Sequence, residues 1–201
     1  MKHKLYILLF ALSIVLTVEA QHDGKAKQVL DNVASTYAQC NGMKIEFKGT
    51  QKGTLWLNGD RFVLDCGGVK SWFDGETQWS YVAGNEEVSV SSPTPEEIQV
   101  VNPYSLITMY QNGFNYRYEG LKLRDNKRGE EITLIPQKRK DIRMISVCVD
   151  EKNIPFYIGV DMNNGHYEEF ILSRFDKTPL PDDFFRFNIK EYPNVEVIDL
   201  R

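Results

Sequence analysis

Residues 53–81 contain short apolar runs that are separated by pairs of turn-forming residues. The three pairs are Asn58-Gly59, Gly67-Gly68 and Asp74-Gly75. Pairs of this kind supply the positive backbone φ angles that tight β-hairpins require. We therefore expect consecutive antiparallel hairpins in this stretch, which makes the chain a mainly β protein.

All three tryptophans of the chain lie in these hairpins, at positions 56, 72 and 79. Hairpins with so many large aromatic side chains form either a thick core or an apolar binding surface. The pattern alone leaves both interpretations open, and the choice between them decides the function.

The remainder of the chain adds one helix at the start and further strands. Residues 24–40 carry apolar side chains at helical spacing, and Gly42 follows as expected just past a helix end. After that the apolar period changes to two, and we count roughly eleven strand candidates at close spacing. The later candidates are 114–119, 130–136, 142–150, 154–161, 166–175 and 184–189. Such spacing predicts an antiparallel barrel or sandwich in a single domain.

The alternation stops between residues 91 and 113, where short helices are expected. Thr94 can cap a helix that starts at Pro95. A second helix is expected to start at Asn102-Pro103 and to carry Leu106 and Ile107 on an apolar stripe.

The first twenty residues are typical of a secretory signal peptide. Lys2 and Lys4 precede an apolar run from Leu5 to Val18, and a small-residue cleavage site ends at Ala20. We expect cleavage near Ala20, which leaves residues 21–201 as one exported domain.

The charge of this domain argues against nucleic acid as a partner. The whole chain has 24 Lys and Arg against 28 Asp and Glu, and the first twenty residues hold two of the lysines and one glutamate, so the remainder has a net charge of −5. Phosphates would select a basic surface instead.

We find no catalytic, metal-binding or cofactor-binding motif. His3 leaves with the signal peptide, His22 lies at the new terminus, and His166 follows a turn. Nucleophile-elbow, zinc, calcium and phosphate-loop patterns are missing. Cys40, Cys66 and Cys148 allow one disulfide at most. We therefore expect a binding protein rather than an enzyme; a hydrolase would need two of the paired glutamates to face one cleft.

At this point the chain resembles the periplasmic outer-membrane lipoprotein carrier family (LolA and its relatives). The resemblance rests on the order of motifs over nearly the whole chain after residue 20. These are the first helix, the GTLWL run with Arg61-Phe62, the WFDGETQWSYV hairpin, the NPYSLI segment and the ending FFRFNIKEYPNVEVIDL. It implies an unclosed antiparallel β-barrel of about eleven strands with a helical lid over an apolar cavity.

The resemblance also implies a function. Members of this family shield the acyl chains of lipoproteins in the periplasm, taking them from an inner-membrane lipoprotein-releasing transporter and passing them to an outer-membrane acceptor. Such carriers are usually monomers. The alternative that remains is a module of the same fold that senses envelope lipids or binds proteins without carrying cargo.

For this function we expect the apolar cavity to be lined by sheet and helix residues together. The candidates are Leu30, Val33, Trp56, Phe62, Leu64, Trp79, Tyr81, Leu106 and Ile107. In many family members an Arg-Pro pair after the LW-type strand latches the lid. Here those positions read Asn58-Gly59, the nearest arginine is Arg61, and the presence of a lid latch stays open.

Overall fold

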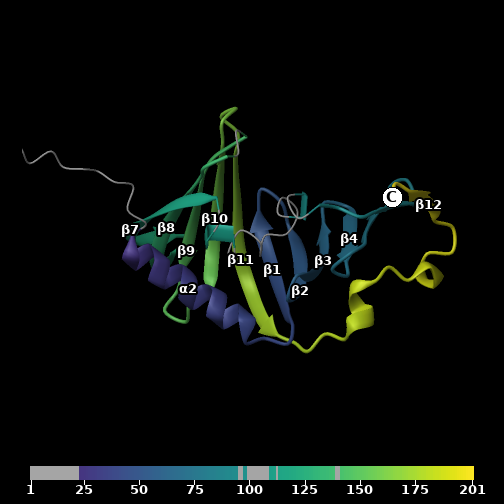
Figure 1. The fold of residues 1–201 in the computed structure, drawn as a ribbon, viewed down its shortest axis with the longest axis horizontal. Helices are drawn as coiled ribbons and strands as arrows, with labels where there is room; N and C mark the ends of the chain where they lie inside the picture. The colour runs from purple at the N-terminus through teal and green to yellow at the C-terminus, as the bar shows by residue number, and fades with distance from the viewer. Residues whose placement is uncertain (1–22, 95–96, 99–108, 112, 139–140) are drawn as a thin grey trace, which may run out of the picture.

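A computed structural model describes residues 23–94, 97–98, 109–111, 113–138 and 141–201, and within them shows one large sheet and one long helix (Figure 1). The strands are β1 (Met43–Gly49), β2 (Gly53–Asn58), β3 (Arg61–Cys66), β4 (Val69–Phe73), β5 (Gln78–Val82), β6 (Glu87–Ser91), β7 (Phe114–Arg124), β8 (Lys127–Pro136), β9 (Ile142–Val149), β10 (Pro155–Met162), β11 (Tyr167–Lys177) and β12 (Glu196–Asp199).

The sheet is a single twelve-stranded layer that does not close on itself. Its order is β12-β6-β5-β4-β3-β2-β1-β11-β10-β9-β8-β7, so β12 and β7 are its two ends. Neighbouring strands pair antiparallel except β12, which lies parallel to β6. The expectation of a mainly β, unclosed sheet is confirmed, and β12 completes the count of twelve.

The helix α2 (Gly24–Ala38) begins at a capping aspartate and buries one stripe. Asp23 Oδ1 accepts hydrogen bonds from the backbone N–H groups of Lys25 (2.9 Å) and Ala26 (3.3 Å), as an N-cap should. Its Oδ2 accepts from the N–H of Tyr118 on β7, which ties the helix to the sheet. The buried residues of the stripe are Ala26, Val29, Leu30, Val33 and Tyr37. Figure 1 shows α2 lying across β7 to β10, so one part of the sheet is covered by this helix.

The predicted hairpins are present. Gly59 has a φ of +64° between β2 and β3, and Gly67 and Gly68 have φ values of +63° and +81° between β3 and β4. Residues that carry a side chain rarely adopt positive φ angles, which explains why glycine occupies these turns.

The expected strand over residues 184–189 is wrong. This region contains two short 3₁₀ helices, Asp182–Phe185 and Ile189–Glu191, instead of a strand. Its aromatic residues therefore do not alternate between two sides of a strand. They pack onto the sheet from a segment that runs over it. The closing strand that the family resemblance implies is present as β12.

The region between β6 and β7 is described only in part. The N–H of Glu97 donates to Thr94 Oγ1 (3.3 Å) and a Glu97 oxygen accepts from the Thr94 N–H (2.8 Å), so the capping role of Thr94 is confirmed. Of the second expected helix, the described residues show a 3₁₀ turn at Met109–Gln111. No helix of the described part is both long and apolar enough to cross a bilayer.

Candidate functional site

Within the described residues the sheet carries apolar clusters on both of its sides: the largest lies beneath α2, a second surrounds Val63, and a third surrounds Cys148. Adjacent residues of β3 show the division: Phe62 packs with α2, whereas Val63 packs with the residues that follow β11. Because neighbouring side chains of a strand point to opposite sides, the first two of these clusters lie on opposite sides of the sheet. We call these the α2 side and the far side.

The structure places Leu30, Val33, Phe62 and Leu64 together in the cluster on the α2 side. Trp56, Trp79 and Tyr81 lie in the cluster on the far side. Leu106 and Ile107 lie outside the described residues. The structure thus divides the seven described candidates between two sides of the sheet, and the role of all nine in binding remains a prediction.

The cluster on the α2 side is closely packed beneath the helix. Leu30 and Val33 are each 1% exposed and Phe62 is fully buried. Burial of such a side chain contributes about 1.5–3 kcal/mol, so this contact is a main source of stability for the helix. These three residues act as ordinary core in this conformation.

At the margins of this core lie accessible apolar residues on the same side of the sheet, which we call the apolar strip. It consists of Phe170, Leu172 and Phe175 on β11, and of Leu64 on β3, which is joined to Phe175 through the buried Ile45 and Leu55. All four are partly exposed and pack against the core. Phe170 meets the ring of Phe47 edge-on at 5.9 Å between centroids.

Three of the four residues in the apolar strip come from β11 and were missed by sequence reasoning. A register shift between Glu46 and Phe47 in the pairing of β1 with β11 places Leu172 opposite Phe47 and Phe175 opposite Ile45. Because of this bulge, two residues three apart share one side, which a period of two does not predict. The sequence signal that could have identified these residues was the two-residue spacing of Phe170 and Leu172, which places both side chains on one side of the strand.

On the far side, the aromatic residues of the hairpins are covered by the chain's own C-terminal segment, residues 180–192. Trp56 meets Phe184 at 5.9 Å between ring centroids, and Trp72 meets Phe187 at 5.3 Å. Tyr81 meets Tyr192 at 4.6 Å. In Figure 1 this segment follows β11 and runs past β2, β3 and β4 to β12.

Polar contacts fix the C-terminal segment in place. Arg61 Nη1 lies 2.5 Å from Asp182 Oδ1, and its guanidinium stacks over the ring of Phe185 at 5.2 Å. Asn58 Nδ2 donates to the Leu180 carbonyl (3.4 Å). Asn58 and Arg61, which mark the departure from the family's Arg-Pro pair, therefore both bind the C-terminal segment on the far side.

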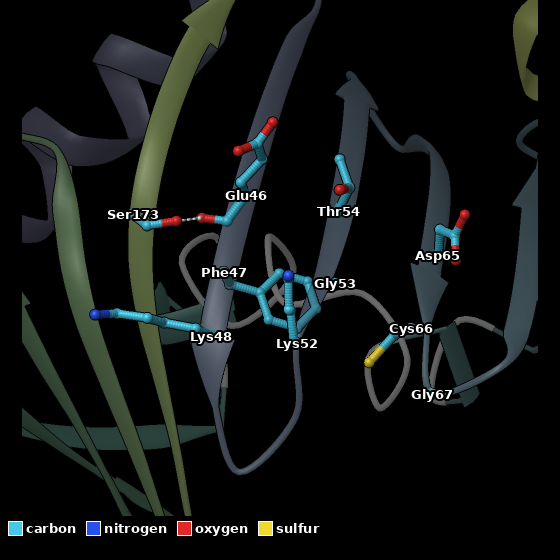
Figure 2. Close-up of a pocket in the computed structure, with 10 residues that line it drawn as sticks. All are labelled: Glu46, Phe47, Lys48, Lys52, Gly53, Thr54, Asp65, Cys66, Gly67 and Ser173. Atoms are coloured by element: carbon cyan, nitrogen blue, oxygen red, sulfur yellow. Dashed lines mark hydrogen bonds between the residues drawn. The ribbon is translucent and has the colours of Figure 1, made fainter.

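An open pocket of about 520 Å³ lies over β1, β2 and β3 (Figure 2). Glu46, Thr54 and Asp65 stand side by side on its wall, in the register row that continues to Tyr81, so they face the far side. Its lining residues are Glu46, Phe47, Lys48, Lys52, Gly53, Thr54, Asp65, Cys66, Gly67 and Ser173. With both carboxylates and ammonium groups on its walls, this pocket does not suit an acyl chain.

A buried ionic cluster lies on the far side of β8 and β9. Glu131 Oε2 accepts from Arg124 Nε (2.7 Å), its Oε1 accepts from Arg124 Nη2 (3.1 Å), and Cys148 Sγ donates to Oε2 (3.3 Å). Burial is the largest single effect and opposes ionisation of Glu131, but the hydrogen bonds from Arg124 and Cys148 and the charges of Arg124 and Lys122 together hold the pKa of Glu131 below its ordinary value. Burial, together with this carboxylate, raises the pKa of Cys148 to about 12. The thiol is therefore protonated at neutral pH, and the cluster has a structural role.

The described part of the chain offers no metal site, since no group of three or more His, Cys, Asp or Glu in it could hold a metal ion. His166 is exposed, as predicted, and its Nε2 lies 3.5 Å from Glu168.

Comparison with known proteins identifies the family and the fold. A family model described as outer membrane lipoprotein carrier protein LolA matches residues 16–153. No curated protein matches the sequence.

Two solved structures show the same fold at low sequence identity. An uncharacterized conserved protein from Thermus thermophilus aligns with a TM-score of 0.62 at 11% identity, over 87% of this chain and 99% of that one. The lipoprotein LppX from Mycobacterium tuberculosis aligns with a TM-score of 0.52 at 11% identity, over 80% of this chain and 100% of that one.

Proposed function

The chain belongs to the outer membrane lipoprotein carrier protein LolA family, and on this ground we propose that it carries acylated lipoproteins or lipids between the inner and outer membranes. In this proposal the protein binds its cargo without catalysis and as a monomer. The signal-peptide pattern of residues 1–20 supports a periplasmic location. The donor would be an inner-membrane lipoprotein-releasing transporter, and the recipient an outer-membrane acceptor.

The observation that carries the proposal is the apolar strip. Leu64, Phe170, Leu172 and Phe175 are large, apolar and partly exposed on the side of the sheet that α2 covers. Each acyl CH₂ group buried against such a surface contributes about 0.8 kcal/mol, so partial cover of an acyl chain suffices to keep it soluble.

The close packing of α2 suggests how the cargo is accommodated. The core residues beneath the helix are almost fully buried, whereas the strip beside them is not. A displacement of α2 away from β11 would enlarge the exposed apolar surface without breaking the sheet. Since each buried side chain of α2 contributes a few kcal/mol at most, the cargo's own burial can offset this cost.

The test is uptake of an acylated lipoprotein from membranes. Residues 21–201 are incubated with inner-membrane vesicles that contain a triacylated lipoprotein and the energised lipoprotein-releasing transporter, the vesicles are sedimented, and lipoprotein in the supernatant is measured. We expect a soluble complex with the wild-type protein, and at least a tenfold loss with Leu172→Glu, because a carboxylate in an apolar site stays unpaired.

Leu123→Glu is the matched control, because Leu123 is 68% exposed on the β7–β8 hairpin and lies outside the apolar strip. It should release as much lipoprotein as the wild type. A wild-type protein that binds no acylated lipoprotein would refute the proposal. One that binds cargo but never delivers it to acceptor-containing vesicles would favour a lipid sensor over a carrier.

A further inference from the structure

On the α2 side of the sheet, side chains change from hydrocarbon to hydroxyl between β3 and β4. One row of paired residues, followed from β1 to β6, shows this change. It consists of Ile45, Leu55, Leu64, Ser71, Ser80 and Ser89. In the neighbouring row the change comes one strand later, because Phe73 on β4 pairs with Gln78 on β5.

The polar residues of this face form a connected group, which we call the hydroxyl strip: Ser71, Gln78, Ser80 and Ser89. The Oγ atoms of Ser71 and Ser80 lie 3.0 Å apart, and Gln78 Nε2 donates to Ser80 Oγ (3.2 Å). Ser89 Oγ donates to the Ser80 carbonyl (3.4 Å). Ser80 therefore stands at the centre of the group.

An ordinary solvated sheet surface does not account for the hydroxyl strip. Ser71 is only 6% exposed, and Gln78, Ser80 and Ser89 are half-buried. Exposed surfaces are normally rich in charged residues, whereas the α2-side residues of β4 and β5 are all uncharged. They are Val69, Ser71, Phe73, Gln78, Ser80 and Val82.

The hydroxyl strip keeps hydrogen-bonding capacity for a ligand. A serine hydroxyl offers one donor and two acceptor positions, and a glutamine amide offers two of each. The bonds within the strip use only part of this capacity. Leu64 of the apolar strip and Ser71 of the hydroxyl strip are a directly opposed pair on β3 and β4, so the two strips adjoin.

We infer that the hydroxyl strip binds the uncharged head of an acylated ligand, namely its ester and amide groups, while the acyl chains lie on the apolar strip. This inference rests on the proposed function and adds the chemical class of the cargo. Ester carbonyls accept from serine hydroxyls, and an amide N–H donates to them. The strip has no cation to neutralise a phosphate, so glyceryl ester and amide heads are preferred over phospholipid heads.

The test compares ligands that share apolar character but differ in their heads. An N-acylated dipalmitoyl-glyceryl-cysteine peptide amide carries ester and amide groups, phosphatidylglycerol carries a phosphate, and phenylnaphthylamine is a fluorescent apolar probe without an ester head. The Ser71→Ala, Ser80→Ala, Ser89→Ala triple variant should bind the peptide about tenfold more weakly, as expected for a few lost hydrogen bonds. Its affinity for phenylnaphthylamine should stay at the wild-type value.

Ser146→Ala combined with Ser173→Ala removes hydroxyls from the far side and is the matched control, with no expected change. Ser80→Ala alone gives the same ordering of ligands if the triple variant is unstable. Equal losses for both ligands, no loss for either, or wild-type preference for phosphatidylglycerol would each overturn the inference. A wild-type protein that takes up none of the three ligands would instead refute the proposed carrier function.

Discussion

Glu131 is a buried carboxyl whose charge depends on the fold. Its side chain is 7% exposed and makes two hydrogen bonds to Arg124, and its pKa lies below the ordinary value. A carboxyl whose pKa is lowered by folding stabilises the folded state above its unfolded-state pKa. That contribution is lost as the pH falls through the lowered, folded-state pKa.

We therefore expect Glu131→Gln to destabilise the protein at pH 7 by about 2 kcal/mol, the size of a lost buried charged hydrogen bond. Urea unfolding of both proteins at pH 7 and at pH 3 measures this. The difference between wild type and variant should shrink at pH 3, because this pH lies below the ordinary pKa of a glutamate and the stabilisation declines from there towards the folded-state pKa. An equal difference at both pH values would show that the charge of Glu131 does not contribute.

Which side of the sheet a residue faces could be predicted only in part. The prediction that Phe62 and Leu64 share one side of their strand, and that Trp79 and Tyr81 share one side of theirs, follows from a period of two and is confirmed. The assignment of both pairs to one cavity does not follow, because Trp79 faces away from α2. Nothing local in the sequence states which side the helix covers.

Among the secondary-structure elements, β2 and β3 show why the sides were ambiguous. Leu55-Trp56-Leu57 and Phe62-Val63-Leu64 are unbroken apolar runs, and the structure buries both sides of these strands. Alternation of apolar and polar residues identifies the buried side of a strand that has one solvated side. When both sides are buried, it cannot tell which of them faces the helix. The turn pairs, in contrast, fix their hairpins locally, so the positions of these strands were predictable.

The C-terminal segment illustrates the opposite case. Phe184, Phe185 and Phe187 predicted a strand by composition, yet Phe184 and Phe185 lie in a 3₁₀ helix, Phe187 follows that helix, and all three pack against the tryptophan cluster. Their burial comes from contact with distant residues, Trp56 and Trp72 among them, and tertiary contacts of this kind outweigh local propensity.

Because all three tryptophans lie in the cluster on the far side, and Trp56 and Trp72 contact the C-terminal segment, tryptophan fluorescence responds to the removal of that segment. A chain that ends at residue 179 should show red-shifted emission as the indole rings become hydrated. Phe185→Ala is the milder variant; Phe185 is fully buried, so the loss should be about 3–5 kcal/mol of unfolding free energy. Unchanged emission in the truncated, folded chain would contradict the proposed cover.

Considered as one molecule, the protein buries apolar surface on both sides of a single open sheet. One core lies between the sheet and α2, and the second lies between the hairpins and the C-terminal segment. Both cores have partly exposed members: Trp56, Trp79 and Tyr81 on the far side, and Leu64 with the β11 residues on the α2 side. Because the C-terminal segment already packs onto the far side, we propose that cargo binds on the α2 side.

The most direct test of this account is a map of where an acyl chain touches the protein. A palmitoyl chain with a terminal photoreactive diazirine is bound to residues 21–201 and irradiated, and the modified residues are identified by mass spectrometry. The account predicts adducts at Leu64, Phe170 and Leu172, with none in residues 180–192. Adducts confined to the C-terminal segment, Trp56 or Trp79 would contradict it and assign acyl binding to the far side.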